Sequence, residues 1–119
     1  MKKIKRSILV LLSIISLVYF SACGGPAAPA AAKTVTFKVW GNCGRCKETI
    51  ESSLKTNGVI NADWNKTTKI MTIEYDTTKI SLDDIHKKIA SVGYDTEKMK
   101  GDDNAYNALH ECCQYERKD

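Results

Sequence analysis

The sequence predicts an α+β fold in which two helices cover one face of a four-stranded antiparallel sheet. Two patterns carry this prediction. Apolar and polar residues alternate in short runs that are typical of half-buried strands, and in two other segments the apolar residues recur every three or four positions, as in amphipathic helices. These segments follow one another in the order strand, helix, strand, strand, helix, strand. The 119 residues hold one such series, so we expect a single folded domain.

The first strand and the first helix flank a short loop. The strand is expected over residues 34–40, with one apolar face formed by Val35, Phe37 and Val39. The helix carries an apolar residue at every fourth position: Cys46, Ile50 and Leu54. It is expected to end at Asn57-Gly58, because glycine readily adopts the left-handed backbone that stops a helix.

The next two strands are expected to pair as an antiparallel hairpin. The first covers residues 59–65 and places Ile60, Ala62 and Trp64 on one side. After the polar turn 66–69, the second strand alternates Met71, Ile73 and Tyr75 with polar residues. A connection this short favours antiparallel neighbours.

The second helix has clear start and stop signals. Ser81 is its expected N-cap, with Asp84 at the capping-box position and Ile80 stapled onto Ile85. Its apolar face is made of Leu82, Ile85, Ile89 and Val92, and Gly93 ends it. A short edge strand is expected over 94–99. The resulting βαββαβ order over residues 34–99 is that of a ferredoxin-like sandwich.

The first residues are expected to direct export. Four cations, Lys2, Lys3, Lys5 and Arg6, precede a 13-residue apolar run, which is shorter than the roughly 20 residues that span a bilayer. The run leads to Ser21-Ala22-Cys23, which resembles the cleavage site of a bacterial lipoprotein. We therefore expect a signal peptide over 1–22, lipidation of Cys23, and a flexible tether of Gly, Pro and Ala over 23–33. An ordinary signal peptide and a retained anchor are the alternatives.

The predicted location is a bacterial membrane, with the domain facing the periplasm or the cell surface. The net charge of +4 comes from the four cations of that first segment, so the rest of the chain is near neutral. It therefore gives no indication of nucleic-acid binding. We also expect no small-molecule substrate.

Cys43 and Cys46 stand between the first strand and the first helix. Orphan backbone amides at a helix N-terminus favour thiolate over thiol, and Arg45 and Lys47 add positive charge. Paired thiolates select soft ions such as Cu(I) and Zn(II). The pair is therefore a candidate site for one ion, bound linearly or trigonally, and Gly41 and Gly44 are expected to keep the loop mobile. A buried structural pair or a disulfide is the alternative.

Residues 34–99 resemble the heavy-metal-associated domain of copper chaperones, P-type ATPase N-terminal domains and periplasmic mercury-binding proteins. The family's loop reads Gly-Met-x-Cys-x-x-Cys, and Cys43 and Cys46 match it, with Trp40-Gly41-Asn42 in place of Gly-Met-x. The resemblance implies a carrier that is not an enzyme and that transfers Cu(I), with Hg(II), Zn(II) or Cd(II) as alternatives. It also implies a partner with exposed cysteine ligands, either a metal-transporting membrane protein or an efflux component.

The same resemblance implies roles for residues around the cysteines. Those expected to support the metal loop are Gly41, Asn42, Gly44, Arg45 and Tyr94. Tyr94, in Val92-Gly93-Tyr94, would shield the ion, or would be a core or edge residue. Trp40 and Trp64 are expected to support the core or the loop, and His86 is expected to face solvent.

A C-terminal extension, 100–119, carries His110, Cys112 and Cys113. A helix is expected to start at Asp102 or Asp103 and to run through Cys113. Three interpretations stay open for this extension. The thiols and the imidazole are extra metal ligands, Cys112 and Cys113 are a redox-active pair, or the two thiols pack against the domain.

Two other functions compete with metal transfer. A thioredoxin-like oxidoreductase would fit Trp40 ahead of a Cys-Gly-x-Cys sequence, but such a site needs a cis-proline and no proline follows residue 29. A zinc-stabilised interaction module would use four ligands: Cys43, Cys46, Cys112 and either Cys113 or His110.

Overall fold

The computed structural model describes residues 31–118. The predicted signal peptide, Cys23 and most of the predicted tether lie outside the described residues. The described elements are β1 (Ala32–Lys38), α2 (Gly44–Ser53), β2 (Val59–Trp64), β3 (Ile70–Asp76), α3 (Leu82–Ser91), α4 (Asp103–Asn107) and the 3₁₀ helix η2 (Glu111–Cys113). None of the helices within 31–118 is long and apolar enough to cross a membrane.

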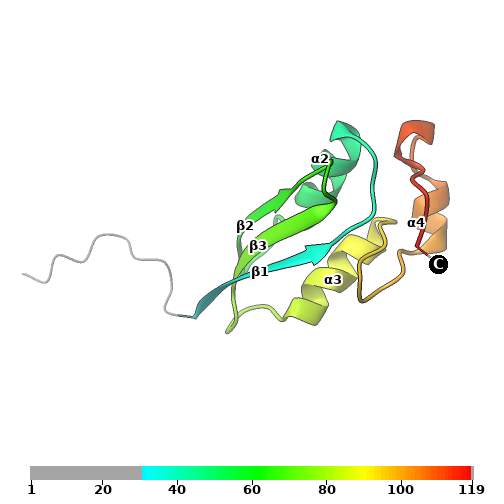
Figure 1. Cartoon of the computed structure of the whole chain (residues 1–119). Helices are drawn as coiled ribbons and strands as arrows, with labels where there is room; N and C mark the ends of the chain where they lie inside the picture. The colour runs from blue at the N-terminus through cyan, green and yellow to red at the C-terminus, as the bar shows by residue number, and fades with distance from the viewer. Residues whose placement is uncertain (1–30, 119) are drawn as a thin grey trace, which may run out of the picture.

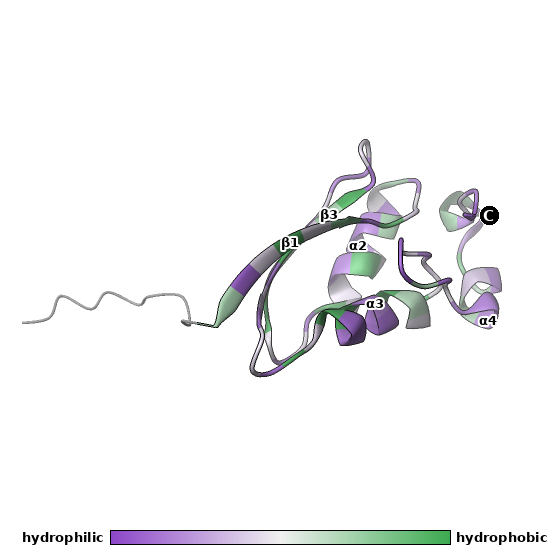
Figure 2. Cartoon of the chain, turned by 60° about the horizontal axis from the view of Figure 1, so that its bottom comes forward, coloured by the Kyte–Doolittle hydropathy of each residue, from purple (hydrophilic) through white to green (hydrophobic). Residues whose placement is uncertain are grey.

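The sheet is antiparallel and has the strand order β1-β3-β2. Its strands curve over α2 and α3, which lie on the same side of the sheet (Figures 1 and 2). Phe37 and Trp64 flank Met71 from the two outer strands, so the apolar positions of all three strands share one face. The predicted hairpin of residues 59–76 is confirmed. Ile60 is an exception, because a register shift between Val59 and Asn61 leaves it 44% exposed.

The prediction of a fourth strand over 94–99 was wrong. Among the described residues this segment pairs with the sheet only through an isolated bridge between Thr96 and Val39, the residue that follows β1. Thr96 then closes a turn, because its amide donates to the Met99 carbonyl at 2.7 Å and its hydroxyl accepts from the Met99 amide at 3.0 Å. This turn takes up the hydrogen bonds that a longer strand would have used, so the described sheet has three strands.

The helices begin where the sequence indicated. Ser81 caps α3 with a complete capping box to Asp84, and Gly93 beyond its end has the left-handed φ of 95°. Green apolar and purple polar residues interchange along α3, as expected for an amphipathic helix (Figure 2). Cys43 is the N-cap of α2, which ends at Ser53, earlier than the predicted Asn57-Gly58.

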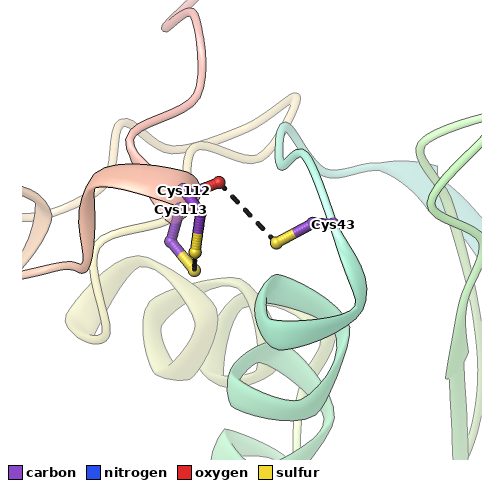
Figure 3. A group of neighbouring side chains, drawn as sticks. All are labelled: Cys43, Cys112 and Cys113. Carbon is purple, nitrogen blue, oxygen red and sulfur yellow. Dashed lines mark hydrogen bonds between the residues drawn. The ribbon is translucent and has the colours of Figure 1, made fainter.

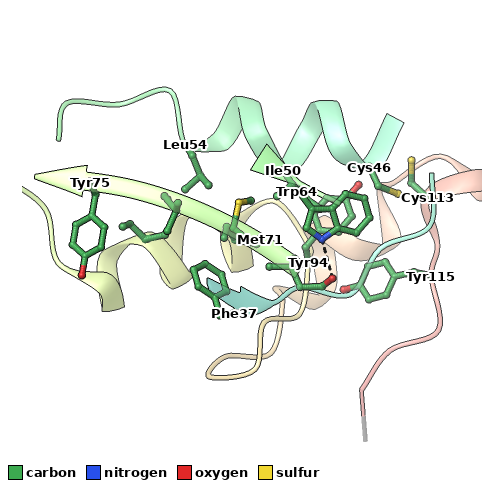
Figure 4. Packing of buried hydrophobic residues seen from close by; sticks show 14 of the residues in the cluster. Phe37, Cys46, Ile50, Leu54, Trp64, Met71, Tyr75, Tyr94, Cys113 and Tyr115 are labelled. Atoms are coloured by element: carbon green, nitrogen blue, oxygen red, sulfur yellow. Dashed lines mark hydrogen bonds between the residues drawn. The ribbon is translucent and has the colours of Figure 1, made fainter. Parts of the chain in front are cut away.

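The core lies between the sheet and the two helices (Figure 4). Trp64 is fully buried, and its indole Nε1 donates to the Val39 carbonyl at 3.1 Å, so this tryptophan supports the core as predicted. His86 was expected to face solvent and is instead fully buried. Its ring lies 4.2 Å from the Phe37 ring, centroid to centroid, and its Nδ1 lies 2.7 Å from the Thr96 hydroxyl.

The C-terminal extension packs against the end of α3 (Figure 1). The predicted helix through Cys113 was wrong in extent: Asp102 caps α4, which ends at Asn107, and the chain resumes as η2. The contact requires glycine, because a Cβ on Gly93 would lie 2.7 Å from the Tyr106 amide nitrogen. The extension is therefore part of the folded domain.

Candidate metal centre

The loop between β1 and α2 brings Cys43 and Cys46 together. Their sulfurs are 3.8 Å apart, because the N-cap and a residue in the first turn of a helix lie on the same side of that turn. Cys46 is fully buried and Cys43 is partly exposed. The Asn42 amide points at the Cys46 sulfur from 3.4 Å. The pair therefore presents one sulfur to solvent and one to the core.

The helix N-terminus makes Cys43 acidic, as the sequence indicated. Backbone amides of Cys46 and Arg45 lower the pKa of the Cys43 thiol from 9.0 to about 7, against a smaller opposing effect of burial. Lys47 was expected to add positive charge beside the cysteines. Its Nζ instead binds Glu51 at 2.7 Å and Asp63 at 2.6 Å. The dipole and amides of the helix, without Lys47, supply the positive potential at Cys43.

Gly41 lets the loop close onto the core. It is buried, and a Cβ at this position would lie 2.8 Å from Cη2 of Trp64 and 3.4 Å from Cβ of Cys46. A Cβ on Gly44, in contrast, would meet nothing within 4 Å. Gly41 therefore provides space for Trp64. Its expected role was different, namely to keep the loop mobile. Asn42 and Arg45 are exposed at the rim of the loop.

The C-terminal extension brings two more thiols to this loop. The sulfurs of Cys43, Cys112 and Cys113 all lie within 4.8 Å of one another (Figure 3). The Cys43 thiol also points at the Cys112 carbonyl oxygen from 3.6 Å. Burial raises the pKa of the Cys113 thiol to about 12, with further effects from the neighbouring Cys46. His110, the other predicted ligand, is exposed and lies outside this group.

Tyr94 is a core residue, which is one of the two roles considered for it. It is fully buried in the core, and its hydroxyl lies beside Cys46 and Cys113 without a hydrogen-bond partner among the described residues. Burial, followed by the Cys46 thiol, raises its pKa. Its ring stacks on Tyr115, 5.5 Å away, so Tyr94 connects the loop to the extension.

Sequence reasoning missed the residues that hold the extension in place. The Tyr115 hydroxyl donates to the Gly93 carbonyl at 2.7 Å and accepts from the Asp95 amide at 2.8 Å. Arg117 binds the buried Asp95 carboxylate. Burial acts to raise the pKa of Asp95, but Arg117 and two backbone amides lower it overall. These partners are 20 to 22 residues apart and follow no local periodicity, so no sequence signal marks them.

The structure argues against the thioredoxin-like alternative. That alternative requires a cis-proline facing the dithiol, and residues 31–118 contain neither a proline nor a cis peptide bond. The zinc-module alternative required the loop and the extension to meet, and their thiols do meet. The arrangement therefore favours soft-metal binding.

Comparisons with known proteins agree with this geometry. The model of the family "heavy-metal-associated domain" matches residues 31–95. A copper chaperone, CopZ, from Staphylococcus aureus is 34% identical over 55 residues, which are 45% of this chain and 81% of the chaperone. A copper-exporting P-type ATPase from Staphylococcus saprophyticus is 41% identical over 59 residues, 49% of this chain; the match spans only 7% of the ATPase.

A solved structure shares the fold. It is the N-terminal domain of a potential copper-translocating P-type ATPase from Bacillus subtilis, in the Cu(I)-loaded state. The match has a TM-score of 0.52 and 30% identity, and it covers 55% of this chain and 84% of that domain. The C-terminal extension begins after the end of the family match at residue 95.

Proposed function

This chain belongs to the heavy-metal-associated domain family, and we propose that it carries Cu(I) on Cys43 and Cys46 and transfers it to a partner. The observation that carries the proposal is the pair of sulfurs 3.8 Å apart at the start of α2. The pKa of the Cys43 thiol is lowered to about 7, so a thiolate is available near neutral pH. Thiolate is the ligand type that selects Cu(I) over harder ions.

Transfer would proceed by exchange of thiolate ligands. The ion is the cargo of the protein, and its oxidation state does not change. A partner thiolate would first bind the ion beside Cys43, which is partly exposed, and the buried Cys46 would leave last. The relatives named as copper chaperones are carriers rather than enzymes, which agrees with the predicted absence of catalysis.

We propose a metal-transporting membrane protein with its own exposed cysteines as the partner. The support is the similarity of this domain to a segment of a copper-exporting ATPase and to a Cu(I)-loaded ATPase domain. A partner domain that presents a similar pair of thiols would accept the ion with little change in affinity.

The test is a competitive Cu(I) titration of the reduced protein against a chromogenic chelator. We expect Cys43→Ser with Cys46→Ser to weaken binding by at least about 100-fold, roughly 3 kcal/mol. Ser52→Ala, an exposed change on the same polypeptide segment, is the matched control and should bind as the wild type does. Equal affinity of the double variant and the wild type would disprove the proposed site.

Export and lipid anchoring at Cys23 are a second part of the proposal. The basic residues, the apolar run and Ser21-Ala22-Cys23 in the sequence support it. Labelling of cells with a radioactive fatty acid should mark the wild-type protein but not Cys23→Ser. Equal labelling of both proteins would contradict this assignment.

A further inference from the structure

Three thiols from two distant segments meet at the metal loop. The sulfurs of Cys43, Cys112 and Cys113 lie within 4.8 Å of one another, although 69 residues separate Cys43 from Cys112 (Figure 3). Cys43 faces the two tail thiols across a short gap, and Cys46, 3.8 Å from Cys43, is also a neighbour of Cys113. Cys43 is therefore shared between two groups of sulfurs.

The distances between sulfurs suit a site with more than two ligands. For metal–sulfur bonds of about 2.3 Å, two sulfurs are about 4.6 Å apart in a linear site, about 4.0 Å in a trigonal site and about 3.8 Å in a tetrahedral site. Cys43 and Cys46 are 3.8 Å apart, and Cys112 and Cys113 are 3.9 Å apart. Within the tail group, the Cys112–Cys113 spacing is that of a three- or four-coordinate site, and the Cys43 sulfur lies within 4.8 Å of both.

The tail thiols are held in place by the fold. The backbone of η2 carries them, and the Cys113 amide donates to the His110 carbonyl at 2.7 Å. Tyr115 and Arg117 follow Cys113 in the extension. The Tyr115 hydroxyl donates to the Gly93 carbonyl, and Arg117 binds the Asp95 carboxylate. Because these contacts form when the chain folds, the thiols need little further ordering to bind an ion.

The burial of the three thiols differs in a way that fits an ion entering from solvent. Cys112 is exposed and Cys43 is partly exposed, whereas Cys113 is only 2% exposed and packs near Tyr115 at one end of the core (Figure 4). An ion would meet the two accessible sulfurs first. Cys113 would then bind it from the protein side and reduce its contact with water.

We propose that Cys43, Cys112 and Cys113 form a three-thiolate site for a soft metal ion, which shares Cys43 with the loop pair. This inference rests on the proposed function. Each thiol releases one proton to solvent as its sulfur binds, and neither the ion nor the sulfurs change oxidation state. An ion captured by Cys43 and Cys46 can pass to this site by exchanging Cys46 for the two tail sulfurs while it stays bound to Cys43. In this exchange the two tail thiols release two protons, and the departing Cys46 thiolate takes up one. The extension thus adds to the two-ligand loop a three-sulfur position that holds the ion between capture and transfer.

The experiment compares sulfur coordination and affinity in variants of the full chain loaded with one equivalent of Cu(I) under reducing conditions. X-ray absorption at the copper edge counts the sulfur neighbours, and competitive titration gives the affinity. We expect three sulfurs in the wild type and two in Cys112→Ala with Cys113→Ala, whose affinity should fall by at least about tenfold. Cys46→Ser should keep three sulfurs. Gln114→Ala, an exposed change in the same segment, is the matched control and should behave as the wild type does.

Two results would overturn the three-thiolate site: unchanged coordination and affinity in the tail variant, or loss of three-sulfur coordination in Cys46→Ser. Thermal unfolding without metal checks that the tail variant is folded. If it is not, Cys112→Ala alone replaces it, because that side chain is exposed and its loss should still lower the affinity. Failure of the proposed function is a different result, in which the wild type does not bind Cu(I) or the Cys43→Ser, Cys46→Ser variant binds it equally well.

Discussion

The guanidinium of Arg117 reaches the buried carboxylate of Asp95 at 2.8 Å and so fixes the C-terminal extension to the chain just after α3. The Asp95 side chain has no exposure to solvent, and that of Arg117 has 18%. Arg117 also binds Asp103 at 2.6 Å and the Gly101 carbonyl at 2.6 Å. The two tail cysteines lie between this anchor and α4, so the position of their sulfurs depends on it.

Loss of this anchor should be costly. Arg117→Ala leaves the Asp95 carboxylate buried with only backbone amides as partners, and we expect a loss of about 3 kcal/mol in the free energy of unfolding. Urea denaturation measures the change. Lys98→Ala, which breaks an exposed pair with Asp83, is the control and should cost less than about 1 kcal/mol. Similar losses in both variants would show that the Asp95 pair contributes no more than a surface contact.

The two glycines of the loop should respond oppositely to alanine. Gly41→Ala places a methyl group against Trp64 and should destabilise the protein by about 1–3 kcal/mol and weaken Cu(I) binding. Gly44→Ala meets open space at the start of α2 and should be neutral or slightly stabilising. Thermal unfolding and Cu(I) titration of both variants test this contrast. An unperturbed Gly41→Ala would mean that Trp64 moves aside easily.

Tyr94→Phe should separate stability from metal binding. Its hydroxyl is buried without a hydrogen-bond partner in residues 31–118, so removing it should raise the stability of the metal-free protein by about 1 kcal/mol. With metal bound, the same hydroxyl can donate to the thiolates of Cys46 or Cys113, and its loss should lower the Cu(I) affinity about tenfold. Chemical denaturation with and without Cu(I) measures both effects.

Tyr75→Phe is the matched control for this change. Tyr75 lies at the far end of the core from the cysteines (Figure 4), and its substitution should leave the Cu(I) affinity unchanged. If Tyr94→Phe and Tyr75→Phe bind Cu(I) equally well, the Tyr94 hydroxyl has no part in holding the ion.

Stability should fall as the solution becomes mildly acidic, because of His86. Burial, with a further effect of Lys98, lowers the pKa of this imidazole below 6.5 in the folded protein. Below about pH 6.5 the unfolded chain therefore binds more protons than the folded one, and the free energy of unfolding should drop by up to about 1.4 kcal/mol per pH unit. Denaturation of the metal-free protein between pH 5 and about 7.5 measures the slope.

His86→Leu should reduce this slope, whereas His110→Gln, at an exposed position, should retain it. The comparison identifies the group responsible without reference to the absolute stability of either variant. A slope that persists in His86→Leu would assign the effect to other groups.

Local patterns predicted most of the domain because neighbouring residues determine them. The capping box of Ser81, the alternation of Phe37 and Val39 and the position of Cys43 ahead of α2 all depend on residues a few positions apart. The loop pair was predicted for the same reason. A metal-binding role for the tail thiols was only one of three interpretations left open by the sequence. Cys112 lies 69 residues after Cys43, and no local pattern predicts that the two come together.

The failures have the same physical origin. His86 follows Ile85 on α3, and its position in the helix pattern predicts a surface residue. Phe37 from β1 and Thr96 from the chain after α3 cover it instead. Ile60 keeps the alternation of a strand, but the bulge beside it turns its side chain to solvent. For His86 a contact between distant segments overrides the local preference, and for Ile60 an irregularity in the pairing of two neighbouring strands does so.

The turn at Thr96 decides where the chain travels next. A fourth strand continued along β1 in the antiparallel direction would have led away from Val39 and from the cysteine loop that follows it. The turn reverses this course, and the Asp102 amide binds the Ala90 carbonyl back at the end of α3, near the loop. The chain thus forms a turn in place of a fourth edge strand. Because of this turn, the extension comes back toward the metal loop and brings the sulfurs of Cys112 and Cys113 with it.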